Sequence, residues 1–219
     1  EGVSAHTKVD EHTGELIFFN YGKAAPYLHF GVVDRAGRLV HYAPVPLPGP
    51  RLPHDLAITE RYVVLNDLPM YWDADLLERG VHAVRMHDEP SRLAVVPRSG
   101  GPDDVVWFEA DPTYVLHWTN AYEDGDEVVL EGFHQANPSP RPNVDDALWM
   151  FRYLALDWME TRLHRWRLNL RTGRCTEERM RDEFTEFGIV NGRAVGRRHR
   201  YVWSAQGAPG WFLFDGFVR

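Results

Sequence analysis

The chain has 219 residues, 44% of them hydrophobic and 13% aromatic, which is enough apolar material for the core of one or two domains. A formal net charge of −8 argues against non-specific nucleic-acid binding, and no stretch approaches the roughly 20 apolar residues of a membrane span, so only peripheral membrane contact is left open. Cys175 is the only cysteine, which excludes a disulfide within the chain and is typical of a reducing, cytoplasmic compartment.

The strongest local signal is the run from Tyr114 to Asp126. It begins with β-prone apolar residues, carries His117 partway along, and ends in a Glu-Asp-Gly-Asp turn signal. A second strand-like run, 127–135, follows at once. Similar apolar runs between turn residues recur on both sides of this hairpin, and the sequence predicts strands at 16–21, 28–33, 39–45, 56–59, 62–65, 92–97, 105–109, 163–170, 175–181, 201–205 and 211–218.

Three segments interrupt the series of predicted strands. Residues 44–53 contain five prolines and cannot form a central strand. Residues 73–79 begin with an acidic cap and are followed by Gly80, which predicts a short helix. Residues 136–146 are rich in Pro, Asn and Ser, so we expect an exposed loop there.

Ten or so short strands with turn signals at intervals of roughly 8–12 residues predict an all-β fold. Long helical periodicity is absent, which argues against a Rossmann fold or an α/β barrel. A sandwich, a barrel and a propeller all remain open, but the strands fall into sets of roughly 45–60 residues, and this spacing favours propeller blades.

Three of the eleven histidines, His6, His54 and His117, stand out by context. His6 and His54 are near the head of a predicted strand, and His117 is partway along one. Their separations are 48 and 63 residues, about one blade each. Equivalent positions on successive blades converge on the axis of a propeller, so three imidazoles there could bind iron, zinc or copper. The spacing alone leaves open that each is a buried histidine with an ordinary hydrogen-bond partner.

The sequence motifs around these histidines resemble those of the carotenoid cleavage oxygenases, a family that includes apocarotenoid and lignostilbene dioxygenases. The three histidine motifs read Ser4-Ala-His-Thr-Lys-Val-Asp10, His54-Asp-Leu-Ala-Ile-Thr-Glu60 and His117-Trp-Thr-Asn-Ala-Tyr-Glu-Asp124. The match continues in order through Arg92-Leu-Ala-Val-Val-Pro-Arg98, Leu163-His-Arg-Trp-Arg-Leu-Asn169 and Thr185-Glu-Phe-Gly188. Thr7 and Gly188 stand where the family more often has proline.

The resemblance implies a seven-bladed β-propeller that holds Fe(2+) on four histidines. His6, His54 and His117 match the first three, and the fourth is expected beyond Arg219. The chain starts without an initiator Met and ends on a strand-like run, so we expect a single domain, residues 1–219, that forms about four blades of a propeller truncated at both ends.

The other histidines are not expected to bind the metal. His199 lies among arginines in Gly196-Arg-Arg-His-Arg-Tyr201 and is predicted on an exposed strand edge. A surface or packing role is favoured for the remaining seven, which are His12, His29, His41, His82, His87, His134 and His164.

Glu186 matches a family glutamate that hydrogen-bonds to a metal-bound imidazole, and its expected partner is His117. From the residues alone, a solvated loop acid would be the better interpretation. Glu123 and Asp124 fall at a hairpin end, where turn and blade-edge hydrogen bonding is favoured over acid–base chemistry. The pair Tyr71 and Trp72 fits either a substrate tunnel or a blade core, and both alternatives stay open.

The chain has no glycine-rich phosphate loop, no Cys-x-x-Cys and no hydrolase or zinc-protease motif. The resemblance implies a non-haem iron dioxygenase that uses dioxygen to cleave a C=C bond of an apocarotenoid or stilbene-like substrate into two carbonyl products. This piece alone is expected to be inactive. The alternatives are an iron-binding family member with isomerase or hydrolase chemistry and a metal-free propeller that serves as a binding module.

Overall fold

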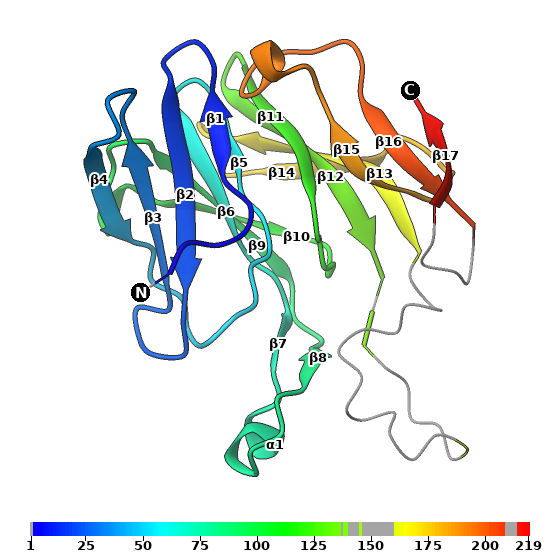
Figure 1. Cartoon of the computed structure of the whole chain (residues 1–219). Helices are drawn as coiled ribbons and strands as arrows, with labels where there is room; N and C mark the ends of the chain where they lie inside the picture. Colours follow the sequence, from blue (N-terminus) through cyan, green and yellow to red (C-terminus); the bar gives the residue numbers. More distant parts are fainter. Residues whose placement is uncertain (1, 137, 140–144, 146–159, 209–213) are drawn as a thin grey trace.

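Antiparallel hairpins dominate the computed structural model, which describes residues 2–136, 138–139, 145, 160–208 and 214–219 (Figure 1). The strands in chain order are β1 (Lys8–Asp10), β2 (Glu15–Tyr21), β3 (Leu28–Val33), β4 (Leu39–Pro44), β5 (Ala57–Ile58), β6 (Tyr62–Asp67), β7 (Met70–Trp72), β8 (Val84–Met86), β9 (Ser91–Pro97), β10 (Val106–Ala110), β11 (Trp118–Asp124), β12 (Glu127–Gln135), β13 (Thr161–Asn169), β14 (Cys175–Arg179), β15 (Thr185–Ile189), β16 (Trp203–Gly207) and β17 (Phe214–Val218). The helical segments are short: α1 (Ala74–Glu78) and the 3₁₀ turns η1 (Pro102–Asp104) and η4 (Gly192–Ala194). The predicted all-β class is confirmed.

The described strands form three four-stranded sheets, one three-stranded sheet and one small two-stranded sheet. The strand orders are β1-β2-β3-β4, β5-β6-β9-β10, β11-β12-β13-β14, β15-β16-β17 and β7-β8. The four larger sheets follow one another side by side, and their first strands, β1, β5, β11 and β15, lie toward a common centre (Figure 1). Strand β11 contacts both β5 and β15. Successive meanders around a centre are the blades of a propeller.

The hydrophobic core lies between neighbouring sheets. Along β6, Val63 and Leu65 pack toward the first sheet, whereas Val64 packs toward the third. Side chains alternate between the two faces of a strand, so the uninterrupted apolar run in β6 serves two cores at once. The third sheet contributes Trp166, which is fully buried and meets Trp118 edge to face with the ring centroids 5.3 Å apart.

An excursion between β6 and β9 leaves the second sheet and projects below the blades (Figure 1). It consists of the two-stranded sheet β7-β8 and helix α1, which Asp73 caps by accepting a hydrogen bond from the Leu76 N–H at 2.9 Å. The predicted short helix is confirmed. Trp72 packs against the core between the second and third sheets, and the ring of Tyr71 stacks on that of His87 with the centroids 3.6 Å apart. For this pair the structure therefore favours a packing role over the lining of a substrate tunnel.

One local prediction was wrong: His117 does not lie partway along a strand but directly precedes β11. The predicted loop 136–146 falls mostly outside the described residues; of those described, Ala136 and Asp145 are exposed as expected, whereas Pro138 and Ser139 are buried. The Ser139 hydroxyl accepts a hydrogen bond from the Met86 N–H at 2.6 Å. A serine in a proline-rich segment is therefore part of the packing against β8.

No helix in the described part of the chain is long and apolar enough to cross a membrane.

Candidate metal centre

The three predicted histidines come together at the centre of the sheets. His6 lies two residues before β1, His54 three residues before β5, and His117 directly before β11. The centroid of the His6 ring is 4.7 Å from that of His54 and 4.9 Å from that of His117, and the remaining pair is 5.3 Å apart. The first strands of the blades converge, so residues at their heads meet although they are far apart in sequence.

The nitrogen geometry fits a single metal ion. The Nε2 atoms of His6 and His54 are 3.1 Å apart, and one nitrogen of each of the three rings lies within 4.8 Å of the others. Two imidazole nitrogens bound at right angles to one ion, each at the roughly 2.1 Å typical of zinc, would be about 3.0 Å apart. The three histidines therefore form a donor set for a borderline metal such as ferrous iron.

Burial keeps the imidazoles of His6 and His54 in the neutral form that metals bind. Desolvation, together with the neighbouring His6 and His117, lowers the pKa of His54 to about 4, and the Asp55 carboxylate only partly opposes this. Burial also lowers the pKa of His6. Both rings are consequently unprotonated near pH 7, and their lone pairs are free for a metal.

Glu186 lies on β15 with 3% of its side chain exposed, and its Oε2 is 2.8 Å from Nδ1 of His117. A carboxylate accepts hydrogen bonds, so Nδ1 of His117 carries the proton and Nε2 keeps its lone pair. Oε2 also accepts a hydrogen bond from the N–H of Phe187, whose ring centroid lies 4.3 Å from that of His117. The structure thus places Glu186 where it fixes both the tautomer and the orientation of the third imidazole.

Gly188 allows β15 to approach β11 closely. A Cβ atom at this position would be 2.4 Å from the Thr119 hydroxyl oxygen and 2.9 Å from the Phe133 ring. The strand pairing of β15 shifts register between Glu186 and Ile189. The register shift and the absence of a side chain at position 188 let this part of β15 lie close to β11, with Glu186 next to His117.

A cavity of about 710 Å³ opens beside His54. Its lining includes three tyrosines, Tyr21, Tyr27 and Tyr42, together with Ala5 next to His6. Volumes of roughly 300–1,000 Å³ are typical of small-molecule sites. The cavity therefore provides space for a substrate next to the histidines.

The segment between β15 and β16 is held by Asn120, which belongs to the His117 motif. The Asn120 side-chain amide donates to the carbonyl oxygens of Ala194 (3.0 Å) and Arg197 (2.9 Å), and its oxygen accepts from the Gly196 N–H (2.9 Å). Asn120 therefore connects the third sheet to the segment that leads into the fourth.

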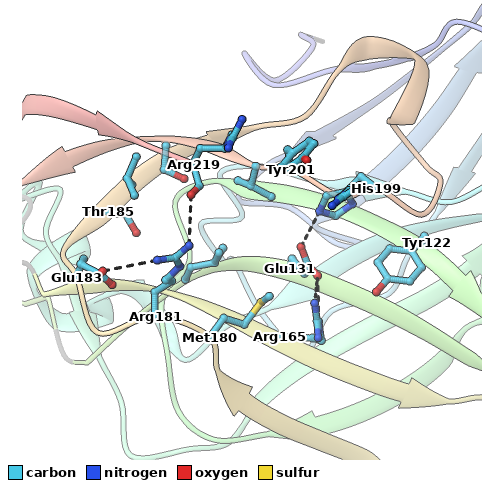
Figure 2. Close-up of a pocket in the computed structure, with 15 residues that line it drawn as sticks. Tyr122, Glu131, Arg165, Met180, Arg181, Glu183, Thr185, His199, Tyr201 and Arg219 are labelled. Atoms are coloured by element: carbon cyan, nitrogen blue, oxygen red, sulfur yellow. Dashed lines mark hydrogen bonds and ion pairs between the residues drawn. The ribbon is translucent and has the colours of Figure 1, made fainter.

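His199 is not on an exposed edge, and that prediction was wrong. Only 8% of its side chain is exposed, and its Nε2 lies 3.0 Å from the carboxylate of Glu131. Figure 2 shows this pair with Arg165 in a cleft of about 390 Å³ between the third and fourth sheets. Within the described residues His199 is not part of the three-histidine group.

Glu123 and Asp124 have the hairpin-edge role that was predicted. Glu123 accepts hydrogen bonds from the Thr59 hydroxyl at 2.8 Å and the Arg61 N–H at 3.0 Å, while Asp124 pairs with Arg198 at 2.7 Å. Both carboxylates tie neighbouring sheets together at a distance from the histidines.

The whole chain, residues 1–219, matches the family model described as RPE65, retinal pigment epithelial membrane protein. The carotenoid 9,10(9',10')-cleavage dioxygenase 1 of Pisum sativum is 32% identical over 203 residues, which cover 91% of this chain and 37% of the relative. The carotenoid cleavage oxygenase of Mycobacterium tuberculosis is 28% identical, with 97% and 49% covered.

Solved structures agree with the fold. The lignostilbene dioxygenase of Pseudomonas brassicacearum superposes with a TM-score of 0.79 at 26% identity, covering 93% of this chain and 43% of that one. A cobalt-substituted Synechocystis apocarotenoid oxygenase superposes with a TM-score of 0.81 at 22% identity, covering 100% and 46%.

The chain spans less than half the length of each of these relatives, so its sheets are part of a propeller, as predicted. The full-length family match, the named relatives and the superposed oxygenases lead to one assignment. The chain belongs to the retinal pigment epithelial membrane protein family, that of the carotenoid cleavage oxygenases, which its histidine motifs resemble.

Proposed function

We propose that the complete protein is a non-haem iron(II) dioxygenase that cleaves a C=C bond of an apocarotenoid or stilbene-like substrate into two carbonyl products. The observation that carries this proposal is the convergence of three imidazoles from three different sheets, the third of which is fixed by a buried carboxylate. The names of the relatives, carotenoid and lignostilbene dioxygenases, support the reaction class.

His6, His54 and His117 would hold ferrous iron together with the fourth histidine that the family resemblance implies. Iron bound there would supply the binding and activation of dioxygen. All four ligands would be neutral, in contrast to the common iron site of two histidines and one carboxylate. Glu186 would not bind the ion itself. Its carboxylate, hydrogen-bonded to Nδ1 of His117, would place a negative charge next to this ligand and so partly balance the charge of the ion.

The remaining residues of the site would bind and orient the olefin. The cavity beside His54 is lined by Tyr21, Tyr27 and Tyr42 together with polar residues such as Asn20 and Lys23. Aromatic residues suit a conjugated substrate, and the polar ones could bind an oxygen-bearing end of it. The Phe187 ring covers one side of His117 and limits the access of water there. The position of a double bond relative to the histidines would then decide which bond is cut.

Labelled dioxygen tests the reaction class. We expect the complete protein, loaded with iron and supplied with ¹⁸O₂, to place one labelled oxygen atom in each of the two carbonyl products, since the double bond takes up both atoms of one dioxygen molecule. Mass spectrometry of the products, trapped rapidly to limit exchange with water, measures this. A product labelled at one carbonyl only, or an unlabelled isomer or ester-cleavage product, would contradict dioxygenase chemistry. A complete protein that takes up no iron when it is loaded would favour a binding module.

Glu186→Gln is expected to weaken metal binding by about 10–100-fold, the usual effect of removing the hydrogen-bond partner of a metal-bound histidine. The amide keeps the size of the side chain but loses the charge that holds Nδ1–H of His117. Competition against a chelator measures the affinity. Glu183→Gln is the matched control because Glu183 is 44% exposed and pairs only with Arg181 among the described contacts, at 3.7 Å. Equal affinities for the two variants would contradict the role of Glu186.

A further inference from the structure

One buried carboxylate contacts all three histidine-bearing segments. Asp55 follows His54 directly and is 1% exposed. Its Oδ2 accepts a hydrogen bond at 2.9 Å from the backbone N–H of Trp118, the residue after the third histidine. Its Oδ1 and Oδ2 atoms lie 2.8 and 3.0 Å from Nζ of Lys8, which stands two positions after the first histidine.

Asp55 is itself anchored to the second sheet. Its Oδ1 accepts a hydrogen bond from the Leu56 N–H at 2.7 Å, and its backbone carbonyl accepts one from the Asn66 side chain at 3.0 Å. Asn66 is buried on β6, so the carboxylate is held from two directions. It can therefore serve as a fixed reference point for the two neighbouring sheets.

Lys8 connects Asp55 to the first sheet. Side chains on one strand face the same way at every second position, and the exposed Val9 between the partly buried Lys8 and the fully buried Asp10 shows the alternation. Lys8 therefore faces the buried side of β1, two positions after His6. Its side chain is 21% exposed, and its ion pair with Asp55 joins the first and second sheets next to the first two imidazoles.

Such a tie is needed because separate sheets share no ladder hydrogen bonds. Each sheet fixes its own strands, whereas the heads of β1, β5 and β11 are related to one another by side-chain contacts. A metal site requires its ligands to be placed within roughly 0.5 Å of the productive geometry. Hydrogen bonds of defined length set such positions more narrowly than apolar packing does.

We propose that Asp55 and Lys8 are positioning residues of the metal centre, which hold the three imidazoles in the arrangement that one ion requires. The proposal rests on the metal-binding function proposed above. Asp55→Asn can still accept the hydrogen bond from Trp118 but turns an amide N–H toward the ammonium of Lys8. Lys8→Met keeps the length of the side chain and removes its charge. Both changes should loosen the same contact.

Cobalt binding to the complete protein tests this without the enzymatic reaction. Co²⁺ is added to the metal-free protein, its dissociation constant is measured by chelator competition, and its visible d–d bands report the ligand geometry. We expect Asp55→Asn and Lys8→Met each to raise the dissociation constant about 10-fold or more and to shift the bands. Lys8→Arg, which keeps the ion pair, should restore most of the affinity. The double variant should lose little more than either single one, because the residues act as a pair.

Asp67→Asn is the matched control. Asp67 is also a buried carboxylate of the second sheet, 5% exposed, but it pairs with Arg51 and Arg92 and contacts none of the three histidine segments. The Asp67→Asn substitution should lower the stability of the protein and leave its cobalt spectrum unchanged. A folded Lys8→Met protein with the wild-type affinity and spectrum would overturn the proposal, even if Asp55→Asn does not fold. A wild-type protein that binds no stoichiometric Co²⁺ or iron would instead overturn the proposed function.

Discussion

His54→Ala is expected to remove the metal from the complete protein and to abolish olefin cleavage. Structural zinc sites with four ligands bind with about 10–16 kcal/mol, so an equal quarter share is about 2.5–4 kcal/mol, or roughly 10²–10³-fold in affinity. His54 stands between the other two imidazoles in chain order, and its Nε2 lies 3.1 Å from that of His6. Iron content per chain and product formation with dioxygen are the two measurements.

His12→Ala is the control for this substitution. His12 lies close to His6 in the sequence but is exposed, and its Nε2 contacts the backbone carbonyl of Arg193 at 3.0 Å. Its replacement should preserve both metal content and turnover. The His54→Ala protein should keep its fold, because the ring is only half-buried and the core clusters lie between the sheets. A His54→Ala protein with a full equivalent of iron and normal turnover would remove His54 from the ligand set.

Short-range signals in the sequence predict most of the strands. Turn residues flank the apolar runs, and most predicted strands agree with the observed ones to within two residues at each end wherever the structure describes them. The exception is the run from Tyr114, because β11 begins only at Trp118. The strands that were missed are β1, β7 and β8, of three residues each, and the five-residue β15, whose Glu186 reads as a loop acid from the residues alone. A three-residue strand has too few positions to show an alternation of apolar and polar residues.

Contacts between sheets account for the errors in burial. His199 has exposed arginines on either side, yet it faces inward, because neighbouring residues in extended chain point in opposite directions. Its partner Glu131 lies 68 positions earlier on another sheet, and nothing in the local sequence of either residue indicates the pair. The same holds for Asp55, which reads as an ordinary strand-head acid until Lys8 and the Trp118 N–H are placed around it.

The sequence could predict those site residues that occupy equivalent positions in successive sheets. His6, His54 and His117 precede the first strands of successive sheets, so their blade-length spacing in the sequence is a direct consequence of the fold. Glu186 follows no such rule, because it lies on a first strand rather than before one. Only the resemblance to related sequences connected it to His117.

Residues 6, 8 and 10 of the first motif have three different roles. His6 belongs to the histidine group, Lys8 pairs with Asp55, and Asp10 is fully buried below them. The Asp10 carboxylate accepts hydrogen bonds from Arg98 at 2.9 Å and from Arg197 at 3.0 Å. Arg98 follows β9 and Arg197 precedes β16, so Asp10 joins the first, second and fourth sheets.

Asp10→Ala is therefore expected to lower the free energy of unfolding of the complete protein by about 3–5 kcal/mol, since removing one partner leaves buried charges uncompensated. Arg98 is 11% exposed and Arg197 22%, which limits how far water can replace the carboxylate. The shift of the denaturation midpoint at constant m-value measures the effect. Asp182→Ala is the control, because Asp182 is 90% exposed and its pair with Arg179 should contribute no more than about 1 kcal/mol.

The pH dependence of that difference separates the charge of Asp10 from the volume of its side chain. Burial alone would raise the pKa of Asp10, but hydrogen bonds from the His12 N–H, Arg197 and Arg98 outweigh it and hold the pKa below its ordinary value. A depressed pKa means that the contribution is fully present above the unfolded-state value of about 3.9 and is lost as pH falls through the lower folded-state value. The stability gap between wild type and Asp10→Ala should accordingly stay constant from pH 7 to about pH 5 and shrink only below about pH 4. A gap that persists unchanged at lower pH would show that Asp10 acts through packing and not through its two arginines.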